Sequence, residues 1–254
     1  MKDSKKIIDK ILPVIFIIFL IGVWQAAVTL GNIQSFILPS PVNVVKALMA
    51  DFNIMKEHIL TTFIEGVTGL LISIVLALIL AVIMDLQPKI KKAVYPVLVI
   101  SQTIPVIALA PLFIIWFGFG MMPKVIIVVI MCFFPIVISI SDGMENVDKD
   151  LINHFKLMGA SKIQRFIHLK LPYGLINFFA GLKIAATYSI MGAVVGEWIG
   201  GQTGLGVYMT RAKSSYAIDK MFAAILVIVI MSMLLFVLIE AISKLCMPWN
   251  KSKR

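Results

Sequence analysis

The chain has 254 residues, of which 60% are hydrophobic and 14% are charged, and its mean hydropathy is +1.01. This apolar share exceeds the roughly half that is usual in soluble domains, so the composition excludes a soluble globule and indicates an integral membrane protein. The net charge of +10 does not indicate nucleic-acid binding, because basic residues of membrane proteins gather in cytoplasmic loops and the chain has no separate basic domain.

Six apolar stretches are long enough to cross a membrane as helices, which takes roughly 20 residues each. The first follows a lysine-rich start but is longer than the apolar core of a signal peptide, so we expect it to remain as a span. The sequence therefore predicts an all-α, polytopic membrane protein that forms a single transmembrane domain over residues 1–254. The predicted spans lie at residues 11–30, 59–84, 94–117, 125–141, 173–199 and 221–243.

The basic residues are distributed unevenly between the two sides of these spans. If the N-terminus is placed in the cytoplasm, sixteen of the 23 Lys and Arg residues are cytoplasmic, six, including Lys124, are external, and Lys183 lies within a span. The positive-inside rule then places both termini and residues 150–172 in the cytoplasm. The sixteen are Lys2, Lys5, Lys6, Lys10, Lys89, Lys91, Lys92, Lys149, Lys156, Lys162, Arg165, Lys170, Lys244, Lys251, Lys253 and Arg254.

Prolines and glycines mark spans three to five as more than plain anchors. Proline leaves carbonyl groups unpaired, which hydrocarbon tolerates only inside protein or beside a water-filled cavity, so we expect spans three and four to be broken or kinked and enclosed. Gly192 and Gly196 in span five allow another helix to approach closely. The prolines are Pro96, Pro105 and Pro111 in span three and Pro135 in span four.

Polar groups inside a membrane are costly and are therefore candidates for function. The alternative for Glu65 and Glu197 is solvation at the membrane surface or pairing with a lysine, and Lys183 could snorkel or pair within the bundle. The candidates to line a solute path are Glu65, Gln102, Thr103, Pro105, Thr187, Tyr188, Ser189, Glu197 and Trp198.

One polar run, from Asp150 to Pro172, separates spans four and five and is typical of a helical hairpin. Gly159 can take the left-handed conformation that ends a first helix, and Ser161 with Gln164 forms a capping box that begins a second one. We expect Pro172 to end the pair. Helical spacing places apolar side chains on one face of each helix. On the first helix these are Leu151, Phe155 and Met158. On the second they are Ile163, Phe166 and Ile167, and Lys170 repeats the same spacing.

The hairpin resembles the coupling loop of binding-protein-dependent ABC transporter permeases, whose signature is Glu-Ala-Ala, three residues, Gly, and a later Leu-Pro. Residues 159–161 and 171–172 fit this signature, but Asn153, His154 and Phe155 occupy the Glu-Ala-Ala positions. The resemblance implies that a cytoplasmic ATPase contacts Asn153, His154, Phe155, Met158, Gly159, Ala160, Ser161, Leu171 and Pro172.

Further motifs are similar to permeases of the nitrate, sulfonate and taurine branch, and most similar to those for pyrimidine precursors of thiamine, of the hydroxymethylpyrimidine type. The resemblance implies an importer in the cytoplasmic membrane that works by alternating access. Its expected partners are an ATPase, an external solute-binding protein, a second permease copy in a homodimer, and lipid. The motifs lie at residues 38–41, 104–112, 116–118, 134–135, 142–143, 181–189, 192–198 and 204–206.

The chain carries no Gly-x-x-x-x-Gly-Lys-Ser/Thr motif, so ATP is expected to be bound by the partner subunit, and no cofactor is expected here. We interpret residues 200–206 as a turn, and the scattered Cys and His residues predict neither a metal site nor a disulfide. One alternative is an ion- or proton-coupled secondary transporter that uses Glu65, Lys183, Glu197 and Glu240, although no inverted repeat is evident. A membrane-embedded enzyme would need clustered catalytic groups, and the titratable residues are instead dispersed.

Overall fold

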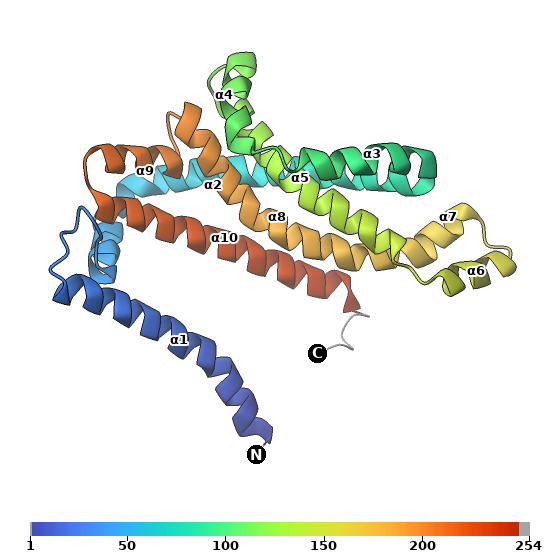
Figure 1. Ribbon diagram of the computed structural model, residues 1–254, viewed down its shortest axis with the longest axis horizontal. Helices are drawn as coiled ribbons and strands as arrows, with labels where there is room; N and C mark the ends of the chain where they lie inside the picture. The colour runs from blue at the N-terminus through green and yellow to red at the C-terminus, as the bar shows by residue number, and fades with distance from the viewer. Residues whose placement is uncertain (1, 249–254) are drawn as a thin grey trace. The chain divides into compact units, whose positions relative to one another are not determined.

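The computed structural model describes residues 2–248, and side chains from Ile11 onward (Figure 1). Every regular element in this part of the chain is helical, which confirms the all-α prediction. The side chains of Lys2, Lys5, Lys6, Lys10, Lys251, Lys253 and Arg254, which contribute to the predicted orientation, lie outside the described residues. The elements are α1 (Lys2–Leu30), α2 (Pro41–Leu86), α3 (Pro88–Ser101), α4 (Val106–Phe117), α5 (Met121–Glu145), α6 (Lys149–Leu157), α7 (Lys162–Arg165), the π-helical turn η1 (Phe166–Lys170), α8 (Leu171–Gly200), α9 (Leu205–Ser214) and α10 (Ile218–Cys246).

The predicted spans correspond to five long apolar helical segments and one bent pair. The five segments are residues 11–30, α2, α5, the continuous stretch from α7 to α8, and α10. Helices α3 and α4 are bent by 99° relative to each other, and they complete six spans if the pair is counted as one. The predicted break in span three is therefore confirmed, and it lies immediately before Pro105. Span four differs, because α5 continues as one helix through Pro135.

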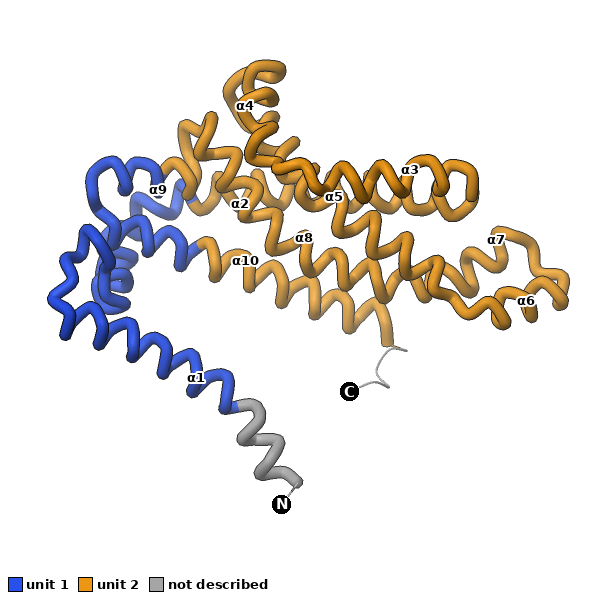
Figure 2. The backbone as a smooth tube through the Cα atoms, in the orientation of Figure 1, with its two compact units in different colours: residues 1–58, 208–227 blue, residues 59–207, 228–254 orange. Residues whose placement is uncertain are grey.

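The chain forms two compact units, which Figure 2 shows in different colours. Unit 1 contains residues 1–58 and 208–227. Within it the Asp51 carboxylate accepts hydrogen bonds from the Tyr208 hydroxyl (2.9 Å) and the Lys220 ammonium (2.7 Å). Burial and the neighbouring Asp51 carboxylate raise the pKa of Tyr208 above its usual value, so the hydroxyl remains a donor.

Unit 2 contains residues 59–207 and 228–254, and its helices α5 and α8 pack closely along a seam of small residues. A Cβ atom at Gly181 would lie only 2.5 Å from the Pro135 carbonyl oxygen, and one at Gly196 would lie 3.0 Å from the Lys124 Cα. A Cβ at Gly192 would lie 3.1 Å from the Met131 Sδ. The predicted close approach at Gly192 and Gly196 is therefore confirmed, because any larger residue would push the two helices apart.

The short helix α4 packs on α5 within the same unit. Ala110 and Phe113 of α4 are buried together with Ile127 of α5, and Ile199 of α8 packs against this cluster. These contacts hold α4 against the ends of α5 and α8 that are remote from α6 and α7 (Figure 1).

Candidate functional site

The first helix of the predicted hairpin, α6, ends in a turn that its backbone hydrogen bonds define fully. Gly159 has a φ of +79° and donates to the Lys156 carbonyl (3.0 Å), and Ala160 donates to the Phe155 carbonyl (2.9 Å). These two bonds make a Schellman motif, which requires a left-handed residue at the position of Gly159. The predicted role of Gly159 in ending the first helix is confirmed.

The second helix, α7, begins with the predicted capping box. The Ser161 hydroxyl accepts from the Gln164 backbone N–H (3.2 Å), and the Gln164 side-chain oxygen accepts from the Ser161 N–H (2.8 Å). The Arg165 guanidinium also donates to the Ala160 carbonyl (2.9 Å). Four residues, 158–161, therefore reverse the chain in a conformation held by local bonds on both sides.

The prediction that Pro172 ends the hairpin is wrong. The chain passes from α7 through η1 into α8 as one continuous helical segment, residues 162–200. In η1 the Leu171 N–H donates to the Phe166 carbonyl, a bond one residue longer than in an α-helix. Pro172 follows directly after this π-helical turn, at the start of α8, and the helical segment continues through the proline.

The tip of the hairpin exposes large apolar side chains next to basic ones. Leu157 and Met158 are 85% and 83% exposed, and Ile163 is 65% exposed. Apolar side chains grouped at a protruding tip are typical of a surface that a partner protein covers. Seven of the predicted coupling residues lie in α6 and the turn after it, and the other two, Leu171 and Pro172, lie at the base of the second arm. Phe155, Ala160 and Pro172 are half-buried, and Asn153, His154, Met158, Gly159, Ser161 and Leu171 are exposed.

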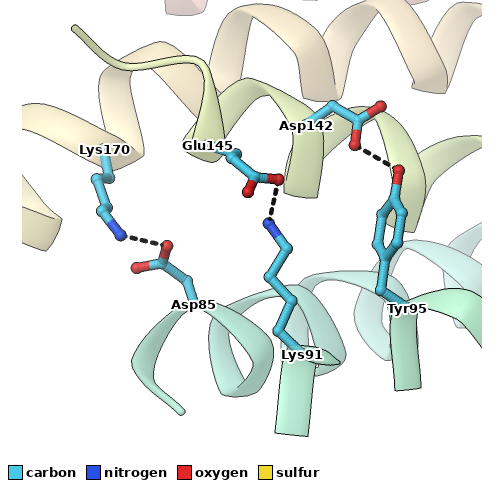
Figure 3. Close-up of polar contacts among 6 residues, drawn as sticks. All are labelled: Asp85, Lys91, Tyr95, Asp142, Glu145 and Lys170. Carbon is cyan, nitrogen blue, oxygen red and sulfur yellow. Dashed lines mark hydrogen bonds and ion pairs between the residues drawn. The ribbon is translucent and has the colours of Figure 1, made fainter. Parts of the chain in front are cut away.

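Three polar contacts tie the two bases of the hairpin to the turn between α2 and α3, and we call them the polar clamp (Figure 3). The Lys170 ammonium, at the end of η1, lies 2.6 Å from the Asp85 carboxylate at the end of α2. From α3, Lys91 pairs with Glu145 (2.8 Å) and the Tyr95 hydroxyl donates to Asp142 (2.7 Å). Both acidic partners of α3 lie in the last turn of α5, so each arm of the hairpin is tied to the α2–α3 turn.

At the opposite end of α5 and α8, charged side chains are buried inside unit 2. Glu65 of α2 pairs with Lys124 in the first turn of α5, so pairing with a lysine, the alternative considered for Glu65, is confirmed. Lys124 was expected just outside span four, but α5 begins at Met121, so Lys124 lies within the helix, where the Glu65 carboxylate neutralises its buried ammonium.

Glu197 of α8 holds the turn between α8 and α9 in place. Its two carboxylate oxygens accept from the Thr62 hydroxyl (2.6 Å) and from the Gly206 N–H (2.6 Å). The Leu205 N–H donates to the Thr62 hydroxyl (2.9 Å), and Gly204 has a φ of +120°. The predicted turn is confirmed for residues 201–204, whereas Gly200 ends α8 and Leu205 and Gly206 begin α9. Glu197 is the side chain around which the turn folds.

The structure separates the other predicted path residues into two groups. Gln102, Tyr188 and Trp198 line one cavity of about 580 Å³ in unit 2. The hydroxyls of Thr103, Thr187 and Ser189 instead donate to carbonyls three residues earlier in the chain, at 2.7 to 2.8 Å. Pro105 immediately precedes α4. Contact of any of these residues with solute stays a prediction.

The charges named for a secondary transporter do not form one group. Lys183 lies over the Phe236 ring, 5.6 Å from its centre, and Glu240 pairs with Lys244 one helical turn away (2.8 Å). Glu65 and Glu197 instead interact with each other and with Lys124. Within residues 11–248, whose side chains the structure describes, His, Cys, Asp and Glu form no group that could hold a metal ion.

Comparison with known proteins places this architecture in a family. Residues 69–249 match the binding-protein-dependent transport system inner membrane component family. The formylaminopyrimidine transport permease protein ThiX of Halalkalibacterium halodurans is 35% identical, with 95% of this chain and 96% of the relative covered. The riboflavin transport system permease protein RibX of Chloroflexus aurantiacus is 32% identical, covering 95% and 90%.

A more distant relative belongs to the predicted branch. The taurine transport system permease protein TauC of Escherichia coli is 26% identical, with 91% of this chain and 86% of the relative covered. The extent of these matches confirms the predicted branch. The chain belongs to the binding-protein-dependent transport system inner membrane component family, and it is a multi-pass permease subunit of an ABC importer.

Proposed function

We propose that this permease carries a pyrimidine precursor of thiamine inward across the cytoplasmic membrane. The formylaminopyrimidine permease of Halalkalibacterium halodurans supports this choice of solute, because the similarity covers nearly the whole of both chains. Riboflavin, taurine, other sulfonates and nitrate are the competing solutes. Two copies of this chain form the path, an external binding protein delivers the solute, and both termini lie in the cytoplasm with the hairpin.

The observation that carries the ATPase-driven part of the proposal is the hairpin with its exposed apolar tip. A Schellman motif and a capping box fix its turn, and Leu157 and Met158 are left for a partner to cover. A cytoplasmic ATPase that binds ATP is that partner. The hairpin lacks the family's Glu-Ala-Ala, so the contact depends on the turn and its apolar tip rather than on a glutamate.

The polar clamp supplies the route from the ATPase to the spans. Moving a two-state gate from 1:99 to 99:1 takes about 5.5 kcal/mol, which ATP binding at the partner provides. A hairpin displaced by the ATPase pulls on Asp85, Lys91 and Tyr95, because those residues are tied to its two bases. The α2–α3 turn therefore follows the hairpin.

Reconstitution in proteoliposomes tests the proposal. The chain is co-expressed with the ATPase and binding protein of its genomic neighbourhood, and import of labelled formylaminopyrimidine is measured with taurine and riboflavin as competitors. We expect import to require ATP on the hairpin side of the membrane and binding protein on the other side. We expect neither taurine nor riboflavin to inhibit it. Import that needs no ATP and stops when an ionophore collapses the ion gradients would refute the ATPase-driven mechanism. Import of a competitor in place of formylaminopyrimidine would refute the solute.

A further inference from the structure

A second cavity of unit 2, of about 400 Å³, lies where the α4–α5 connection and the α8–α9 turn meet α2. Its volume is within the range of sites for small ligands, roughly 300–1,000 Å³. Its lining includes two charged side chains, Glu65 and Lys124. The apolar side chains of Phe119 and Met121 and the polar ones of Gln202 and Thr203 also line it.

Glu65 gives this cavity a chemical preference. Its side chain is almost completely buried, with 2% of the residue exposed, and one oxygen pairs with the Lys124 ammonium. The other oxygen, Oε2, is also buried and accepts no hydrogen bond from any described residue. A buried carboxylate oxygen without a donor is costly, so it marks a position where a donor from outside the chain is favoured.

The one neighbouring group that could reach Glu65 is Glu197, which lies within hydrogen-bonding distance of it. Glu197 supplies a donor only when it carries a proton, and as a carboxylate it accepts from Thr62 and Gly206. Two carboxylates therefore share the single ammonium of Lys124. This balance favours a ligand that brings an N–H group or a positive charge, and it disfavours an anion without one.

We propose that this cavity is a transit site for a solute with an amino group, and that the amino group donates to Glu65 Oε2. The inference rests on the proposed function and narrows it, since an aminopyrimidine meets the requirement, whereas nitrate and amine-free sulfonates do not. Phe119 and Met121, which line the same cavity, provide apolar surface for a small ring.

Equilibrium binding to the purified permease–ATPase complex in nanodiscs, without binding protein, tests the site. The probes are a labelled aminopyrimidine and the same ring with a methyl group in place of the amino group. We expect the wild type to prefer the amino probe by about tenfold or more, and Glu65→Gln to abolish this preference. Since Glu65→Gln leaves Lys124 unpaired, the double variant Glu65→Gln with Lys124→Met is measured as well, and Glu240→Gln is the matched control.

The outcomes separate this site from the proposed solute. Equal affinity of the wild type for the two probes, or a preference that survives both Glu65 variants, would overturn the site, and Oε2 would then be satisfied by a proton shared with Glu197. Import of the aminopyrimidine by such a wild type would leave the proposed function intact. If the reconstituted importer carries taurine instead, the solute proposal fails, and the same comparison with taurine and amine-free ethanesulfonate decides the site. The site is supported if the Glu65 variants lose the preference for the amino compound, whether the two compounds compared are the pyrimidine probes or taurine and ethanesulfonate.

Discussion

Replacing Lys170 by Met would test whether the polar clamp transmits movement from the hairpin to the spans. The Lys170 ammonium lies 2.6 Å from Asp85, and the two side chains are 27% and 11% exposed. Exposed ion pairs contribute about 0.2–1 kcal/mol, whereas breaking a fully buried pair costs about 3–5 kcal/mol. For this partly buried pair we expect a loss of about 1–3 kcal/mol, which corresponds to a roughly 5- to 150-fold weaker coupling.

The measured quantity is the number of solute molecules imported per ATP hydrolysed in proteoliposomes. We expect Lys170→Met to retain ATP hydrolysis and to import less solute per ATP, because the ATPase still binds the tip while one base of the hairpin is loose. The swapped pair, Asp85→Lys with Lys170→Asp, should recover part of the loss. Lys244→Met is the control, since it removes an ion pair to Glu240 that is not part of the clamp.

Two results would refute this reasoning. An unchanged ratio in an assembled Lys170→Met complex would show that the contact transmits nothing. If Asp85→Lys and Lys170→Asp each lower the solute imported per ATP and the swapped pair recovers none of it, then each residue acts separately rather than through the pair. Thermal unfolding of each complex distinguishes the second case from misfolding.

Three further changes test local parts of the structure. Gly159→Val should weaken binding of the ATPase by roughly tenfold, because a left-handed residue with a side chain costs about 1–2 kcal/mol. Gly159→Asn should retain most of the affinity. Both affinities are measured by titrating the ATPase onto the permease. Tyr95→Phe should lower the free energy of unfolding by about 1–2 kcal/mol in chemical denaturation by losing its hydrogen bond to Asp142, and an unchanged value would mean that this bond adds no stability. Gly204→Ala should lower the melting temperature more than Gly120→Ala, since both glycines have positive φ but only a Cβ at Gly204 would collide with Glu197; equal effects would contradict this.

The parts of the structure that the sequence predicts well are those that local interactions determine. The turn of the hairpin follows from Gly159 and from the Ser161 cap, whose hydrogen bonds join residues at most five apart. Spans follow from apolar length. The error at Pro172 arose because a π-helical turn can absorb a proline at the start of a helix, and no sequence pattern signals that turn.

The polar clamp and the buried Glu65–Lys124 pair could not be predicted in the same way. The clamp joins residues that are 85, 54 and 47 positions apart, and the buried pair joins residues 59 apart. Each of these charges alone is equally consistent with a solvated loop or a membrane surface. Lys124 was therefore placed outside the predicted span, since only the position of Glu65 in space explains why an ammonium can be buried at the start of α5.

The seam of small residues between α5 and α8 couples the hairpin mechanically to the Glu65–Lys124 cavity. Helices α5 and α8 carry the hairpin at one end and the Glu65–Lys124 cavity at the other, and the small residues between them leave no room for one helix to move independently of the other. Gly196 packs on the backbone of Lys124, so a displacement of α8 reaches the residue that pairs with Glu65. A closely packed pair of helices transmits strain rather than absorbing it. Movement of the hairpin by an ATPase would therefore change the cavity at the far end, as alternating access requires.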